Sequence, residues 1–311
     1  MPTSSDSPVH VRVPATSANL GPGFDSAGLA LALHDDVIVR TTSGGVEVVV
    51  EGEGAGRLPL DERHLVVRAL RAAFDRLGGQ PRGLALHCTN RIPQSRGLGS
   101  SSAAIVAAVV AARALVEGGD ELLDARGALA LADELEGHPD NVAACLHGGV
   151  TFAWSTSDGP RVVRLDAHDD LAPVAFVPGT TSSTAQVRGL LPPSVPYADA
   201  VLNASRAALL PLALTRDPQL LLPATEDRLH QGYRAPAMPA TAALVDELRG
   251  QGVPAVVSGA GPTVLALTTR ATRAAVAARE RPGWSVRPLD VEPAGARVVP
   301  PHPGDGNTPI G

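Results

Sequence analysis

A loop rich in glycine and serine, NRIPQSRGLGSSS, leads directly into an alanine- and valine-rich stretch that predicts a buried helix over residues 101–117. The start of a helix offers backbone N–H groups without partners and a partial positive charge, so it attracts anions. Gly97 and Gly99 would let the backbone approach a ligand closely, and the serine hydroxyls could contact a phosphate or a magnesium ion. The same pattern also fits a serine-capped core helix after a glycine turn, so alone it leaves both interpretations open.

The basic residues narrow the choice of phosphate chemistry. All 26 of them are arginine, and the sequence contains no lysine. This excludes a Walker A loop, a protein-kinase active site and Schiff-base catalysis, each of which needs a lysine. A phosphate site in this chain would have to use backbone N–H groups, arginine, hydroxyls or a metal ion.

Composition indicates a globular protein without nucleic-acid or membrane partners. The 311 residues are 44% hydrophobic, and the net charge of −6 is spread along the chain rather than gathered in a basic patch. The longest apolar run, residues 103–112, is too short to span a bilayer. The first eight residues are polar, unlike a secretory signal. Cys88 and Cys145 lack metal-ligand spacing, which favours free thiols in a reducing cytoplasm.

The elements that would position this loop mix strands and helices without strict alternation, which predicts an α+β fold in two layers. Up to residue 166 we expect strands within 9–50 and over 83–93, 148–155 and 160–166, and helices over 61–78, 101–117 and 124–137. In the second half we expect strands within 172–179, 253–269 and 284–291, and helices over 196–214, 239–252 and 271–283.

Three further polar stretches accompany the phosphate loop. They are PATSANLGPGFDSAG at residues 14–28, ELEGHPDN at 134–141 and SGAGPT at 258–263. Together with GLGSSS they match, in order, the signature regions of the GHMP small-molecule kinases. The first two are similar to the homoserine kinase branch of that family, and the resemblance covers residues 11–290. A lone glycine loop would be weak evidence, whereas this joint match is specific.

The resemblance implies an N-terminal, ATP-binding domain of the ribosomal protein S5 domain 2-like type over residues 9–153. It also implies a ferredoxin-like C-terminal domain over 154–298, and residues 299–311 are expected to form a disordered tail. The implied activity is transfer of the γ-phosphoryl group of ATP to the hydroxyl of L-homoserine, with Mg²⁺, in threonine biosynthesis. The implied setting is the cytoplasm, and a homodimer is expected because it is common in the family.

For ATP and Mg²⁺, the resemblance implies contacts along the phosphate loop: Pro93, Gln94, Ser95, Arg96, Gly97, Leu98, Gly99, Ser100, Ser101 and Ser102. Ser101 and Glu136 would hold the metal, with Glu134 as the competing ligand. The Arg96 side chain could reach a phosphate or point into solvent. His64 stands where the family often has asparagine in the nucleotide-base site, which leaves base contacts open.

For homoserine, the resemblance implies a site made by Asn19, Asp25, His138, Asp140, Thr184, Arg188, Arg234, Gly259 and Gly261. Two arginines could bind the substrate carboxylate, an aspartate could take its ammonium group, and an asparagine could orient its hydroxyl. The residues expected beside the reacting hydroxyl are Asn19, Asp140 and Asn141. Taken singly, each of these residues also has an ordinary role in a turn or on the surface.

Two alternatives remain at this stage. The first is another kinase of the same family, acting on a mevalonate-pathway intermediate or a sugar; a neutral sugar would have no use for the arginine pair. The second is a catalytically silent, ATP-binding regulator, which would have no chemical need for Ser101, Glu136 and Asp140. A purely structural protein would leave four polar, glycine-rich stretches unexplained.

Overall fold

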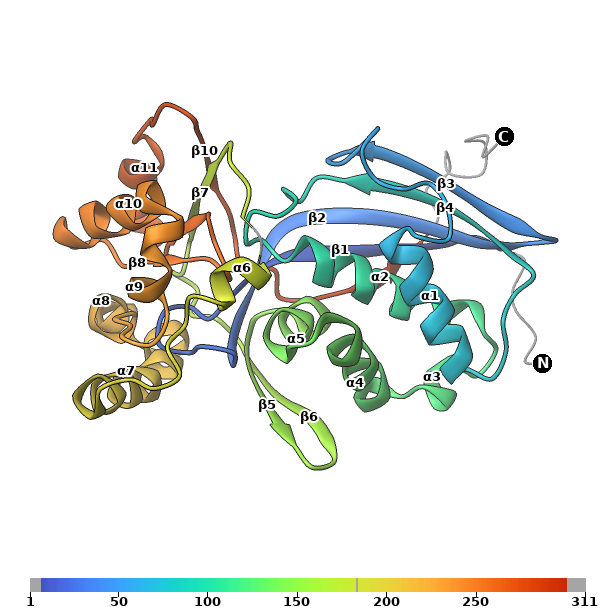
Figure 1. Ribbon diagram of the computed structural model, residues 1–311, viewed down its shortest axis with the longest axis horizontal. Helices are drawn as coiled ribbons and strands as arrows, with labels where there is room; N and C mark the ends of the chain where they lie inside the picture. Colours follow the sequence, from blue (N-terminus) through green and yellow to red (C-terminus); the bar gives the residue numbers. More distant parts are fainter. Residues whose placement is uncertain (1–6, 183, 301–311) are drawn as a thin grey trace.

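The computed structural model describes residues 7–182 and 184–300, which form two layered units side by side (Figure 1). The larger unit is built on a seven-stranded sheet in which the order β11-β1-β2-β4-β3 is extended by β5 on β2 and by β6 on β5. Its strands are β1 (Val9–Ala18), β2 (Ala27–Thr42), β3 (Gly45–Gly52), β4 (Gly83–Asn90), β5 (Val150–Thr156), β6 (Gly159–Leu165) and β11 (Arg297–Val299).

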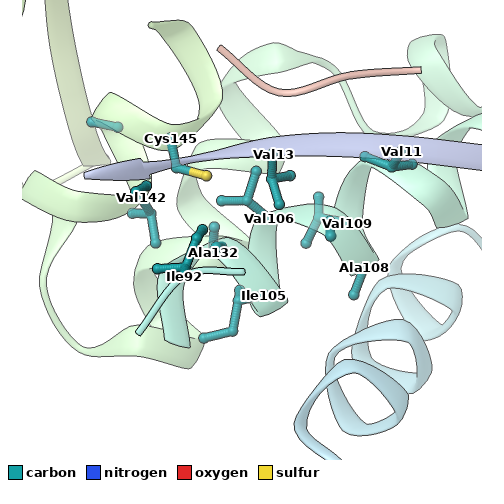
Figure 2. Close-up of a cluster of buried hydrophobic side chains, with 14 of the residues drawn as sticks. Val11, Val13, Ile92, Ile105, Val106, Ala108, Val109, Ala132, Val142 and Cys145 are labelled. Carbon is teal, nitrogen blue, oxygen red and sulfur yellow. The ribbon is translucent and has the colours of Figure 1, made fainter. Parts of the chain in front are cut away.

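Helices cover one face of this sheet (Figure 1). They are α1 (Leu65–Arg76), α2 (Ser100–Leu115), the short α3 (Gly119–Leu122), α4 (Ala125–Glu136) and α5 (Pro139–His147). The central helix, α2, contacts α1, α4, α5 and β1, which explains why its sequence is apolar on nearly every side. Figure 2 shows side chains of α2, among them Val106 and Val109, beside Val11 and Val13 of β1 in this core.

The smaller unit has an antiparallel sheet in the order β10-β7-β9-β8. Its strands are β7 (Val174–Pro178), β8 (Ala255–Val257), β9 (Val264–Ala266) and β10 (Trp284–Pro288). Helices α10 (Pro239–Gly250) and α11 (Arg270–Ala277) pack against it and give the chain order βαββαβ. This is the ferredoxin-like arrangement, so the expected fold is confirmed.

The long connection from β7 to α10 is helical. It contains α6 (Thr184–Arg188), α7 (Tyr197–Thr215), α8 (Leu221–Ala224) and α9 (Gln231–Arg234), with 3-10 turns at Pro218–Leu220 and Ala235–Ala237. Of these, α6 lies between the two units, whereas α7 and α8 lie on the outer side of the smaller one (Figure 1). The expected Arg188 is in α6 and pairs with Asp25.

Strand pairing crosses the expected domain boundary. The division between residues 153 and 154 falls inside β5, and β6 belongs to the larger sheet because Trp154 and Arg161 are partners in a β5–β6 hairpin. The last strand, β11, also returns to the larger sheet, where Val299 pairs with His10. Val299 is therefore not part of a disordered tail, and residues 301–311 of that expected tail lie outside the described residues. Within 7–182 and 184–300, no helix is both long and apolar enough to cross a membrane.

Candidate active site

The phosphate loop before α2 has a backbone that suits glycine. Ser95, Gly97 and Gly99 have φ angles of 54°, 77° and 71°, in the left-handed region. Space is restricted as well: a Cβ on Gly97 would lie 2.2 Å from the Ser258 carbonyl oxygen, and one on Gly99 would lie 1.9 Å from Thr16 Oγ1. Side chains at these positions would displace the loop or its neighbours.

The three motifs that accompany this loop in the sequence also meet in space. The Ser258 hydroxyl of the SGAGPT turn donates a 2.6 Å hydrogen bond to the Gly97 carbonyl oxygen. The next residue, Gly259, donates its N–H to Ala18 (3.1 Å) and accepts a 2.9 Å hydrogen bond from Asn19 Nδ2. The C-terminal turn thus holds the first loop and the phosphate loop together.

A cavity of about 600 Å³ opens where these segments meet, within the size range of small-molecule sites. Fourteen residues expected at the site line it: Asn19, Asp25, Ser95, Gly97, Gly99, Ser100, Ser101, Glu136, His138, Asp140, Asn141, Arg188, Arg234 and Gly259. Four other residues complete its lining, namely Thr181, Ser182, Gln186 and Ala260.

The two candidate glutamates differ in their surroundings. Glu136 accepts hydrogen bonds from Ser101 Oγ (2.7 Å) and Ser102 Oγ (2.8 Å) and lines the cavity. Glu134 pairs instead with Arg76 at 2.6 Å, and its side chain is 62% exposed. This arrangement favours Glu136 over Glu134 as a ligand. No group of three or more His, Cys, Asp or Glu side chains among the described residues is arranged to hold a metal ion.

The HPDN motif turns polar groups into the cavity at the start of α5. Pro139 is the first residue of the helix, where a proline is tolerated. Asp140 is 3% exposed, and its Oδ1 accepts the Asn141 N–H at 2.7 Å. His138 Nδ1 lies 3.2 Å from the same oxygen, and the nearby Asp140 carboxylate raises the pKa of His138. Asn141 Oδ1 accepts a 2.8 Å hydrogen bond from Thr16, so its side chain is held in place.

Two arginines line the same cavity. Arg188 makes a bidentate ion pair with Asp25, at 2.7 and 3.0 Å. Arg234 is 3% exposed; its Nη1 is 3.3 Å from His230 Nδ1, and its Nε has no hydrogen-bond partner. Burial, followed by the charge of Arg188, lowers the pKa of Arg234. Two guanidinium groups with donors to spare form a site for an anion.

Several expected contacts lie elsewhere. Arg96 does not line the cavity: its partly exposed guanidinium donates to the carbonyl oxygens of Gln94 (3.1 Å), Pro178 (2.9 Å) and Gly179 (3.1 Å). It therefore ties the phosphate loop to the end of β7. The other expected residues that do not line the cavity are Pro93, Gln94, Leu98, Ser102 and Gly261. Thr184 lies in α6, but its side chain is outside the described residues.

A second cavity, of about 250 Å³, adjoins the first and shares Ser95, Ser100 and Ser101 with it. Aliphatic side chains make up much of its wall: Val13, Val37, Leu58, Pro59, Leu65, Val66, Ala103 and Ala104. His64 also lines it; this residue is 4% exposed, neither ring nitrogen has a hydrogen-bond partner, and burial lowers its pKa. Asp35 also lines this cavity, and burial raises its pKa to about 6. The expected place of His64 beside a ligand cavity is consistent with this geometry.

Similarity to known proteins identifies the family of this chain. Residues 64–149 match the GHMP kinases N-terminal domain, and residues 209–281 match the GHMP kinases C-terminal domain. A homoserine kinase from Streptomyces avermitilis is 60% identical over 292 residues, which cover 94% of this chain and 96% of the relative. The chain belongs to the GHMP kinase family. Its alignment over nearly the whole relative places this GHMP kinase with the homoserine kinases.

Solved structures agree with this placement of the GHMP kinase. The crystal structure of the homoserine kinase from Cytophaga hutchinsonii is 27% identical and matches 96% of this chain and 99% of its own, with a TM-score of 0.78. The mevalonate kinase of L. major, at 17% identity, matches 95% of the chain with a TM-score of 0.70. This second likeness reflects the shared fold alone.

In the segment after β7, sequence reasoning named Thr184 and Arg188 but missed three other residues that line the cavity. Thr181, Ser182 and Gln186 line it, and Ser182 also donates to the Gly261 carbonyl oxygen at 2.9 Å. Gln186 lies in the same short helix as Arg188, so the expected role of Arg188 was the available signal. A helix of five residues has too little periodicity to be recognised from its pattern.

Proposed function

We propose that this chain is an ATP-dependent homoserine kinase, which transfers the γ-phosphoryl group of ATP to the hydroxyl of L-homoserine and releases ADP and O-phospho-L-homoserine. The observation that carries the proposal is the identity of 60% to a homoserine kinase over 96% of that relative. The cavity supports it, because a phosphate-type loop and an arginine pair face the same space.

ATP would extend across both cavities. Its phosphates would contact the start of α2, where N–H groups and the helix dipole favour negative charge. Its base would enter the aliphatic cavity beside His64, which offers a buried imidazole without other hydrogen bonds. Because Ser95, Ser100 and Ser101 line both cavities, a single nucleotide can reach from one to the other.

Ser101 and Glu136 fit a magnesium ion that arrives with the nucleotide. Their oxygens are hard ligands, they lie side by side, and they face the cavity where the phosphates would be. Magnesium commonly uses only one or two protein ligands and takes the others from phosphates and water. When bound, the ion would neutralise phosphate charge during transfer.

Homoserine would bind at the arginine end of the larger cavity. Arg234 and Arg188 would receive its carboxylate, since charge-assisted hydrogen bonds from guanidinium groups suit that shape. Asp140 is better placed than Asp25 for the ammonium group, because both Asp25 oxygens already accept from Arg188. The substrate hydroxyl would then face the phosphate loop near Asn141.

The chain's own contribution to transfer would be mainly positioning. Phosphoryl transfer depends on alignment and charge stabilisation and does not require a strong base. Asn19 would act by holding the loop that forms the site, because its side chain donates to Gly259 (2.9 Å) and accepts the Asp25 N–H (3.0 Å). Asp140 and Asn141 remain the candidates for contact with the hydroxyl.

The decisive experiment is ADP release from Mg·ATP by the purified protein with L-homoserine, mevalonate, galactose or no acceptor. Release with L-homoserine alone is the expected result. Mevalonate also carries a carboxylate but has no ammonium group, so its use would contradict the role given to Asp140. Release with galactose, a neutral sugar, would contradict the carboxylate-binding role given to the arginine pair. ATP binding without turnover of any acceptor would favour the silent regulator.

The cytoplasmic location, the homodimer and the lack of nucleic-acid or membrane partners stay predictions. Light scattering of the purified protein over a range of concentrations would measure its oligomeric state directly.

A further inference from the structure

Phe24 has no place among the site residues expected from the sequence, yet it contacts both arginines of the cavity. The guanidinium carbon of Arg234 lies over its ring at 5.1 Å from the centroid, and that of Arg188 lies over it at 5.6 Å. The ring also stacks on His230, with 4.8 Å between centroids. Phe24 itself does not line the cavity, so any effect on a ligand must pass through its neighbours.

The loop that carries Phe24 is held in a fixed shape from both ends. Asn19, Leu20 and Asp25 have positive φ angles of 71°, 47° and 54°, a conformation that few non-glycine residues adopt without tertiary support. The second half of the chain supplies support. His230 Nε2 lies 2.9 Å from the Gly21 carbonyl oxygen, and Asn203 donates to the Pro22 carbonyl oxygen at 3.0 Å.

The Phe24 ring lies beside two positive charges that repel each other. Arg188 and Arg234 carry like charges, and the charge of Arg188 contributes to the lowered pKa of Arg234. A carboxylate between them would offset the repulsion but would also occupy their N–H donors, as Asp25 does for Arg188. The face of an aromatic ring attracts a cation without forming a hydrogen bond to each of its N–H groups. Arg234 Nε is buried and has no hydrogen-bond partner.

We propose that Phe24 is a positioning residue for substrate selection: its ring holds the two guanidinium groups side by side with donors free for the carboxylate of the acceptor. The inference rests on the proposed function, because it takes that carboxylate to belong to homoserine. The alternative is that Phe24 only fills space between the loop and α9, in which case the ring would matter for stability and not for selection of the acceptor.

The test compares Phe24→Leu, which keeps an apolar side chain but removes the ring, with Phe24→Tyr, which keeps the ring. Cation–π contacts of this kind account for about a tenfold effect on affinity. Phe24→Leu should therefore raise KM for homoserine about tenfold while KM for ATP and kcat change less than about twofold. Phe24→Tyr, which keeps the ring, should show little of this rise in KM for homoserine. Thermal unfolding of each variant reports folding separately.

A double-mutant cycle with Arg234→Ala makes the test specific. If Phe24 acts through the arginines, Phe24→Leu should raise KM for homoserine much less in the Arg234→Ala background than in the native chain. Additive effects would overturn the inference, as would equal rises in the KM values of both substrates or a Phe24→Tyr variant as impaired as Phe24→Leu.

Turnover of homoserine by the unaltered enzyme is measured first and separates the two claims. If the unaltered enzyme does not use homoserine, the proposed function fails and this inference fails with it. If it does use homoserine and Phe24→Leu changes only thermal stability, the inference fails alone. A selective rise in KM for homoserine, lost in the Arg234→Ala background, supports both.

Discussion

Ser101 Oγ donates a 2.7 Å hydrogen bond to Glu136 Oε1 and so joins the first turn of α2 to the last residue of α4. One helix start and one helix end thereby present their oxygens at a single point of the cavity wall. Gly137 follows at once with a φ of 91° and ends α4, which sets the position from which Glu136 faces α2.

Glu136→Gln should lower kcat with Mg·ATP by about 100-fold or more, because an amide is a much poorer magnesium ligand than a carboxylate. The fold should persist, since the amide oxygen can still accept from Ser101 and Ser102. Steady-state ADP release measures the effect. Glu134→Gln is the matched control and should stay within about twofold of the native rate, because Glu134 is exposed and paired with Arg76. A reversed order of the two variants would move the metal to Glu134.

Arg234→Ala should raise KM for homoserine by about 10- to 100-fold, the usual range for loss of hydrogen bonds to a charged group. KM for ATP should change little, because Arg234 lies at the far end of the cavity from the phosphate loop in the proposed pose. Arg188→Ala should have the smaller effect of the two, since Arg188 is partly exposed and shares its donors with Asp25. Equal increases in KM for both substrates would place Arg234 outside the acceptor site.

His64→Leu should separate stability from ATP affinity. Burial of an imidazole without hydrogen bonds destabilises the free protein by about 1–3 kcal/mol, so an apolar side chain of similar size should leave the free energy of unfolding unchanged or higher. The same change should raise KM for ATP several-fold and leave KM for homoserine unchanged. Urea unfolding and steady-state kinetics on one preparation give both numbers. An unaltered KM for ATP would show that the base does not contact His64.

Asp35→Asn should stabilise the protein at pH 8 and not at pH 4. Burial raises the pKa of Asp35 to about 6, above its ordinary value of 3.8. The stability that this group contributes is fully present below about pH 4 and is lost as the pH rises through 6. A neutral amide escapes that loss, which amounts to about 3 kcal/mol at most. Urea unfolding at the two pH values measures the difference, and equal effects at both would contradict the assignment.

Asp36→Asn is the matched control, and its effect on the free energy of unfolding should have the opposite sign. Burial tends to raise the pKa of Asp36, but hydrogen bonds from Arg12, Arg91 and His10 outweigh burial and lower it to about 2. Its contribution to stability is therefore fully present above about pH 4 and is lost as the pH falls from there through 2. Asp36→Asn should destabilise the protein at pH 8, where Asp35→Asn stabilises it.

Local rules predicted the loop and the helix ends of the site, whereas its individual ATP, metal and substrate residues came from the family resemblance. Gly97 and Gly99 predict a loop whose backbone a ligand can approach closely. The sequence EGHPDN contains both the glycine that ends α4 and the proline that starts α5. Two assignments depended on tertiary contacts instead. Arg96 binds carbonyl groups at the end of β7, about 80 positions away, and Phe24 meets His230 across more than 200. No local pattern carries such information.

The strand β11 was also missed from the sequence, because three residues in a proline-rich segment show no alternation. Its pairing with β1 has a consequence for how the protein is made. During synthesis, β1 emerges from the ribosome well before its neighbour β11. Until residues 297–299 emerge, β1 is the edge strand on this side of the larger sheet, and His10, Val11 and Arg12 lack their β11 partners. An unpaired edge invites association with other chains, so the late pairing with β11 replaces a long edge strand, β1, by a three-residue one.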